Sequence, residues 1–112
     1  MSTDEPFLPV IGDVYEVHRD VRAGAALDKK EWRRAVVVEV PEAGGMIGIV
    51  TRTTTKAKPG VHSGKDAASG LTKEGRFDRP GWVQAVHWNP RTVRRVGKLD
   101  EALFAKIKER FV

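Results

Sequence analysis

The chain has 112 residues, no cysteine and a net charge of +5 at pH 7. The absence of cysteine excludes disulfide scaffolds, zinc fingers, iron–sulfur sites and thiol nucleophiles. The length suits a single domain over residues 1–112. No apolar run approaches the ~20 residues of a membrane-spanning helix, so we expect a cytoplasmic protein that does not act at a membrane.

The positive charge is concentrated in the middle of the chain. From Ala43 to Leu99 the sequence holds 11 basic and three acidic residues, a net charge of +8, whereas the remainder carries −3. Such a basic region is typical of domains that bind a polyanion such as nucleic acid. A charged surface that only keeps the domain soluble has the same composition, so both interpretations remain open.

The first part of the chain predicts one strand and one long loop. Residues 1–9 are polar and contain two prolines, so we expect a frayed start. Val10–Val17 then alternates apolar and polar side chains, as a half-buried strand does. His18–Trp32 has no clean period, which predicts a long loop with a short helical turn at Ala25–Lys29.

Two strands joined by a turn are predicted next. Arg33–Val40 includes three consecutive valines, which favour a strand buried on both faces. Pro41–Gly45 has the composition of a turn, and Met46–Thr55 is rich in β-branched residues. We therefore expect the two strands to pair as an antiparallel hairpin.

The last part of the chain predicts a loop, two strands and a helix. Lys56–Pro80 is rich in glycine and basic residues, which indicates a second long and mobile loop. Gly81–Trp88 and Arg91–Val96 predict short strands. In Leu99–Val112 the apolar residues fall on one helical face, which must pack on a sheet or on another subunit. Five short strands and one helix predict a mainly β protein with a small, strongly bent sheet or barrel.

The histidine and glycine patterns predict no metal and no cofactor. His18, His62 and His87 lack the spacing of metal ligands. The segment Gly60–Asp66 is one residue short of a phosphate-binding P-loop, and Asp66 stands where a Ser or Thr would hold magnesium.

Arginines and threonines meet at one end of the predicted hairpin. Counted from the turn, Arg33 and Arg34 lie opposite roughly Thr53–Thr55. A guanidinium can bind a phosphate through two hydrogen bonds and stabilise a phosphoryl transition state, and a threonine hydroxyl can hydrogen-bond a phosphate oxygen. Threonine also favours strands and arginine favours strand ends, so a purely structural role remains open.

Several short motifs follow one another in a recognisable order. They are Gly12–Val14, Arg33–Val38, Ile49–Val50, Thr53–Thr55, Arg91–Val93 and the helix that begins near Leu99. Their order and spacing, over nearly the whole chain, resemble the MazF/PemK family, the toxins of toxin–antitoxin pairs. The resemblance implies a small SH3-like barrel of the PemK/CcdB type with a C-terminal helix. It also implies a homodimer and a cognate antitoxin as partners.

The same resemblance implies an activity and its residues. Members of the family cleave single-stranded RNA without a metal. The 2′-hydroxyl attacks the adjacent phosphate and leaves a 2′,3′-cyclic phosphate and a 5′-hydroxyl. Carried over, the catalytic arginine falls on Arg33 and its threonine partner on Thr54, with Thr53 as the alternative. The family usually has a proline after the arginine. Arg34 stands there instead, so Arg34 is the alternative arginine.

Basic residues beyond the threonines are the candidate RNA contacts. They are Lys56, Lys58, Lys65, Arg76, Arg79 and Arg91. A basic loop over residues 56–80 could close over a bound strand and neutralise its phosphates. The alternative is a surface loop without a role.

Two other functions fit the same residues. A non-catalytic relative could inhibit a host protein, as related toxins that bind a topoisomerase do, and the exchange of proline for Arg34 keeps this open. A plain nucleic-acid-binding SH3-like barrel could stack bases on Trp32, Trp82 or Trp88, for which core packing is the alternative.

Overall fold

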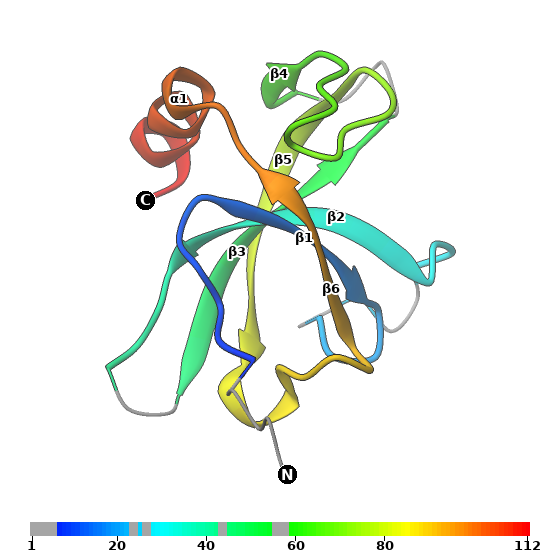
Figure 1. The fold of residues 1–112 in the computed structure, drawn as a ribbon, viewed down its shortest axis with the longest axis vertical. Coiled ribbons are helices and arrows are strands. Elements are labelled where there is room, and N and C mark those ends of the chain that lie inside the picture. Colours follow the sequence, from blue (N-terminus) through cyan, green and yellow to red (C-terminus); the bar gives the residue numbers. More distant parts are fainter. Residues whose placement is uncertain (1–6, 23–24, 26–27, 43–44, 55–58) are drawn as a thin grey trace, which may run out of the picture.

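The computed structural model describes residues 7–22, 25, 28–42, 45–54 and 59–112. These residues form a curled, six-stranded antiparallel half-barrel with one C-terminal helix (Figure 1). The strands are β1 (Asp13–His18), β2 (Trp32–Glu39), β3 (Met46–Thr53), β4 (Val61–Ser63), β5 (Gly75–Gln84) and β6 (Val93–Lys98). They lie in the order β4-β5-β3-β2-β1-β6, and each pairs antiparallel with its neighbours.

The strands predicted at residues 10–17, 33–40, 46–55 and 91–96 are confirmed as β1, β2, β3 and β6, with ends shifted by at most three residues. β1 begins late because Gly12, at a φ of +90°, makes a turn immediately before it. The predicted terminal helix is α1 (Glu101–Phe111). Its N-cap is Asp100, whose carboxylate accepts a hydrogen bond from the backbone N–H of Leu103 at 3.2 Å.

The prediction of an irregular segment over residues 56–80 is wrong at residues 61–63 and 75–80. β4 and the first half of β5 lie there, and Phe77 is fully buried opposite Arg52 of β3. Glycine is typical of loops, but Gly75 here permits a close approach of β5 to β3. A Cβ atom on Gly75 would lie 2.5 Å from the carbonyl oxygen of Thr53.

The strand predicted at residues 81–88 is confirmed for residues 81–84 and wrong for residues 85–88. β5 ends at Gln84, and a 3₁₀ turn, η1 (Ala85–His87), follows it. This turn directs Trp88 back into the core, where its ring contacts Tyr15 edge-on at 4.9 Å between centroids. Within the described residues between His18 and Trp32 there is no helix, and part of the helical turn predicted at 25–29 lies outside them.

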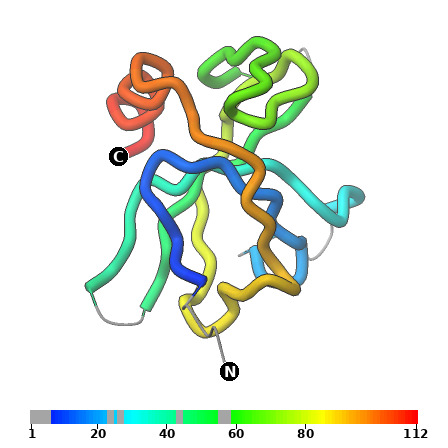
Figure 2. The backbone as a smooth tube through the Cα atoms, viewed as in Figure 1, coloured from blue at the N-terminus to red at the C-terminus, as the bar shows by residue number. Residues whose placement is uncertain are grey.

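Residues 64–74 form a loop at the end of the molecule where β4 lies (Figure 2), and this loop contacts the end of β6. The backbone N–H of Lys98, at the end of β6, donates to the carbonyl oxygen of Ala68 at 3.1 Å. Ser69 is fully buried, and Gly97 leaves no room for a Cβ atom beside Ala68. The expected mobile loop is therefore a folded cover over one end of the sheet.

Two apolar clusters hold the fold, one on each face of the central strands. The first contains Tyr15, Val17, Ala35, Val37, Ile47, Ile49, Val83, Trp88 and Val93. The second contains Val14, Val36, Val50, Leu71, Phe77, Leu99 and Ile107. Alternation along β2 explains the division, because consecutive side chains of a strand point to opposite faces. The helix contributes Ile107 to the second cluster, so its apolar stripe packs on the sheet of its own chain.

Candidate functional site

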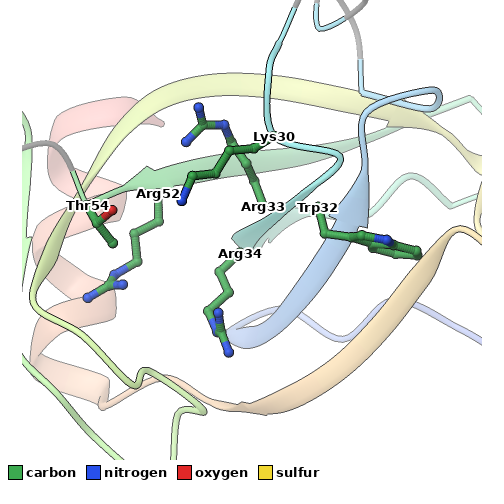
Figure 3. Close-up of a pocket in the computed structure, with 6 residues that line it drawn as sticks. All are labelled: Lys30, Trp32, Arg33, Arg34, Arg52 and Thr54. Atoms are coloured by element: carbon green, nitrogen blue, oxygen red, sulfur yellow. The ribbon is translucent and has the colours of Figure 1, made fainter.

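The register of β2 against β3 decides which predicted site residues share a face. Ala35 pairs with Thr51. Continued by one and two residues, the same register places Arg34 beside Arg52 and Arg33 beside Thr53. Because side chains alternate, Arg33 and Arg34 leave β2 on opposite faces. Figure 3 shows Arg34 and Arg52 extending to the same side, away from the Arg33 guanidinium.

A small open pocket lies where β2 begins and β3 ends (Figure 3). It is lined by Lys30, Trp32, Arg33, Arg34, Arg52 and Thr54. Four of these six side chains are cationic, and none is a carboxylate. Three residues that the sequence singled out, Arg33, Arg34 and Thr54, therefore meet at one place. A cluster of this kind attracts an anion with several oxygen atoms, such as a phosphate.

Arg33 is engaged by a carboxylate. Its Nε and one terminal nitrogen donate to the two oxygens of Asp28 at 2.5 and 3.0 Å. Asp28, whose side chain is 13% exposed, also accepts from Arg22 at 2.8 Å. The Arg33 guanidinium holds the pKa of the Asp28 carboxyl well below its usual range, and Arg22 contributes in the same direction. Arg33 is thus held in an ion pair with a carboxylate that it shares with Arg22.

Arg34 has no such carboxylate clamp. Its Nε donates to the carbonyl oxygen of Gly70 at 2.7 Å, and a terminal nitrogen lies 3.7 Å from a carboxylate oxygen of Glu16. That second distance is too long for a hydrogen bond. The Arg34 side chain is 30% exposed. Its guanidinium is therefore fixed at one edge and open toward the pocket.

The two predicted threonines also differ in burial and in the face on which they lie. Thr53 is buried at the end of β3, on the face of Arg33. Thr54 is exposed and lines the pocket. It follows Arg52 by two residues and therefore lies diagonal to Arg34 across the hairpin. The pairs that share a face are therefore Arg33 with Thr53 and Arg34 with Thr54.

Arg52 is a pocket residue that sequence reasoning missed. It is only 6% exposed, and its Nε donates to the Ser63 hydroxyl at 2.7 Å. One terminal nitrogen donates to the carbonyl oxygens of Ser63, at 3.1 Å, and Lys73. Burial, together with the nearby charge of Arg34, lowers the pKa of Arg52. The only sequence feature that pointed to Arg52 was its position between two threonines. No pattern in the sequence predicted its hydrogen bonds to Ser63 of β4.

The other predicted RNA contacts do not line the pocket. Arg76 and Arg79 lie on β5, where Arg76 is half-buried and Arg79 is exposed. Lys65 and Arg91 are exposed on the loops that precede β5 and β6. Lys56 and Lys58 lie outside the described residues.

The three tryptophans have three different environments. Trp88 is a core residue, as its packing alternative predicted, whereas Trp82 is 48% exposed. Trp32 is half-buried at the pocket edge. The Arg94 guanidinium covers its ring at 4.0 Å from the centroid, and His18 contacts it edge-on.

No protein-family model matches the chain, and no curated protein matches it. Across the described ranges, no three His, Asp or Glu side chains gather as a metal site would need. The same residues contain no helix of the length and apolarity required to cross a bilayer.

Proposed function

We propose that this protein is a metal-independent endoribonuclease that cleaves single-stranded RNA at the pocket between β2 and β3. One observation carries the proposal. Arg33, Arg34 and Thr54, which the sequence singled out for phosphate chemistry, line one cationic pocket without a carboxylate in its wall. The curled antiparallel sheet with its C-terminal helix is compatible with an SH3-like barrel of the PemK/CcdB type.

The pocket residues suit a reaction that uses the substrate's own nucleophile. The 2′-hydroxyl oxygen forms a bond to the adjacent phosphorus as the bond to the 5′-oxygen breaks. The 2′-hydroxyl proton passes to water, and the leaving 5′-oxygen takes a proton from water. Negative charge grows on the non-bridging oxygens, where fixed guanidinium donors stabilise the transition state more than the ground state. The products are a 2′,3′-cyclic phosphate and a 5′-hydroxyl.

Of the candidate pairs, we assign the phosphate to Arg34 and Thr54. They lie on one face and at the pocket, whereas Asp28 already occupies the Arg33 guanidinium through two hydrogen bonds. Arg33 then acts as a positioning residue. Through Asp28 it ties the loop before β2 to the strand, and the backbone N–H of Lys30 also donates to Asp28 at 3.0 Å.

The two hydrogen bonds from Arg33 to Asp28 also favour a second candidate function, nucleic-acid binding without cleavage. If the reaction requires a free guanidinium at Arg33, the chain retains the cationic pocket but not the chemistry. The non-catalytic inhibitor of a host protein remains an alternative of the same kind.

Purified protein mixed with a long single-stranded RNA in EDTA tests the proposal. We expect fragments with 2′,3′-cyclic phosphate and 5′-hydroxyl ends, identified by mass spectrometry. RNA whose 2′-hydroxyls are methylated should stay intact. Cleavage that requires magnesium would overturn the mechanism, and binding of RNA without cleavage would favour the second function. We further propose a homodimer and a cognate antitoxin as partners.

A further inference from the structure

Arg52 is a buried cation whose charge no carboxylate matches within the described part of the chain. Its acceptors are the hydroxyl and carbonyl oxygens of Ser63 and the carbonyl oxygen of Lys73, all of them neutral. A buried charge is costly unless an opposite charge or several hydrogen bonds compensate it. The neutral acceptors compensate in part and leave a net positive charge at the pocket wall.

A second guanidinium adds to this charge. Arg34 lines the same pocket on the same face, and its proximity lowers the pKa of Arg52. The nearest carboxylate to Arg34 is that of Glu16, at 3.7 Å, and Asp28 is taken by Arg22 and Arg33. Four cationic side chains thus line a pocket that has two carboxylates at its margin. An anion placed between Arg34 and Arg52 would relieve their repulsion.

Both guanidinium groups are fixed before any ligand arrives. Arg52 is held at Nε and at one terminal nitrogen, and among the described residues its other terminal nitrogen has no acceptor. Arg34 is held at Nε by Gly70, with no further hydrogen bond among those residues. Gly75 lets the Arg52 guanidinium approach β5 closely, because a Cβ atom at Gly75 would lie 2.9 Å from the guanidinium carbon. Fixed donors bind an anion at a smaller entropic cost than mobile side chains do.

We propose that Arg34 and Arg52 form a preorganised clamp for one phosphate group, separate from the Arg33–Asp28 ion pair. The choice of a phosphodiester as the ligand rests on the proposed function, but the anion site itself does not. Two guanidinium groups that approach from different strands suit a group with two free oxygens, as in a nucleic-acid backbone. Free inorganic phosphate has the same chemistry, and the experiment distinguishes the two sources.

The first arm measures binding of a 2′-O-methyl RNA oligonucleotide, which cannot be cleaved, at several salt concentrations in EDTA. Arg52→Gln should weaken binding about tenfold and lower the slope of log K against log salt by roughly 0.7, the value for one lost phosphate contact on a single strand. Arg110→Gln is the matched control. It removes an exposed arginine from the last turn of α1 and should leave affinity and slope nearly unchanged.

The second arm measures thermal unfolding with and without inorganic phosphate, at constant ionic strength set with chloride. Phosphate should raise the Tm of the wild type more than that of Arg52→Gln. If only the oligonucleotide distinguishes the two proteins, the ligand is the nucleic-acid backbone and free phosphate is excluded. Equal affinity and equal slope for wild type and Arg52→Gln would overturn the clamp.

A second variant covers the case in which Arg52→Gln does not fold. Arg34→Gln changes a partly exposed side chain that has one neutral hydrogen-bond partner, Gly70, and the Glu16 carboxylate at 3.7 Å. This variant should give the same loss of affinity and slope. If Arg34→Gln binds the oligonucleotide like the wild type, the clamp is wrong. Oligonucleotide binding that depends on Arg34 or Arg52, in a protein that cleaves no RNA, would support the clamp and contradict the nuclease. A failure of the Arg34–Arg52 clamp and a failure of the proposed nuclease activity therefore give different results.

Discussion

Arg33 and Arg34 are neighbours in the chain, but a carboxylate holds the guanidinium of Arg33 at 2.5 Å and that of Arg34 only at 3.7 Å. Arg33 is paired with the carboxylate of Asp28 through two hydrogen bonds, whereas Arg34 donates to the neutral carbonyl of Gly70 and opens toward a cationic pocket. The alternation of a β-strand separates them. Arg34, whose carboxylate contact with Glu16 at 3.7 Å is too long for a hydrogen bond, is therefore more available to a ligand than Arg33.

Asp28→Asn should make the stability of the protein less dependent on acid pH. Because the pKa of Asp28 is lowered in the folded state, its ion pairs stabilise the protein fully above the ordinary aspartate pKa of about 3.9. That contribution is lost as the pH falls below this value toward the lowered pKa. In urea unfolding, the wild type should have a larger free energy of unfolding than the variant at neutral pH. The difference between the two free energies should shrink as the pH is lowered.

Glu109→Gln is the control for this experiment, because Glu109 is exposed on α1. The unfolding free energy of the Glu109→Gln variant should be close to that of the wild type at each pH. A constant difference between wild type and Asp28→Asn from neutral pH to about pH 2 would contradict the role assigned to the Arg33–Asp28 pair.

Gly75→Ala should displace Arg52, which forms one wall of the pocket. The new methyl group would meet the Thr53 carbonyl at 2.5 Å and the Arg52 guanidinium at 2.9 Å, so β5 or Arg52 must move. We expect a loss of roughly 1–3 kcal/mol in unfolding free energy and weaker binding of the oligonucleotide. Gly81→Ala is the matched control on the same strand, since a Cβ atom there has no neighbour within 4 Å. Equal effects of the two substitutions would show that Arg52 is not constrained by Gly75.

The assembly prediction is a dimer in solution. The apolar stripe of α1 already packs on its own sheet through Ile107, so the helix does not require a partner for that face. Exposed apolar residues remain at the end of the β3–β5 pair and in η1, namely Met46, Trp82 and Val86. We expect light scattering at micromolar concentration to give twice the chain mass. A monomer that cleaves RNA would contradict the homodimer.

The central hairpin was predictable because its signal is local. Three valines in β2 and the β-branched residues of β3 indicate strands, and the turn between them sets an approximate register. This register was sufficient to bring the arginines and threonines together. It was not sufficient to separate Arg33 from Arg34, because a shift of one residue exchanges the two faces.

The rest of the site depends on contacts between distant parts of the chain. Arg52 is buried because Ser63 and Lys73, 11 and 21 residues away, accept its hydrogen bonds. The first part of β5, residues 75–80, was missed because Gly75 and Pro80 are typical of loops, although Gly75 here permits close strand packing. The capture of Arg33 by Asp28 depends on the path of an irregular loop, for which the sequence has no periodic signal.

Single-turnover cleavage by Arg34→Gln and Arg33→Gln in EDTA tests the central claim most directly. With RNA in contact with excess enzyme, the rate of appearance of 2′,3′-cyclic phosphate ends reports the chemical step. Loss of the Arg34 charge should slow this step by about 10²–10³-fold, whereas Arg33→Gln should slow it much less and mainly lower the Tm. If Arg34→Gln cleaves at the wild-type rate while Arg33→Gln is inactive, the phosphate lies on the Arg33 face and the account is wrong.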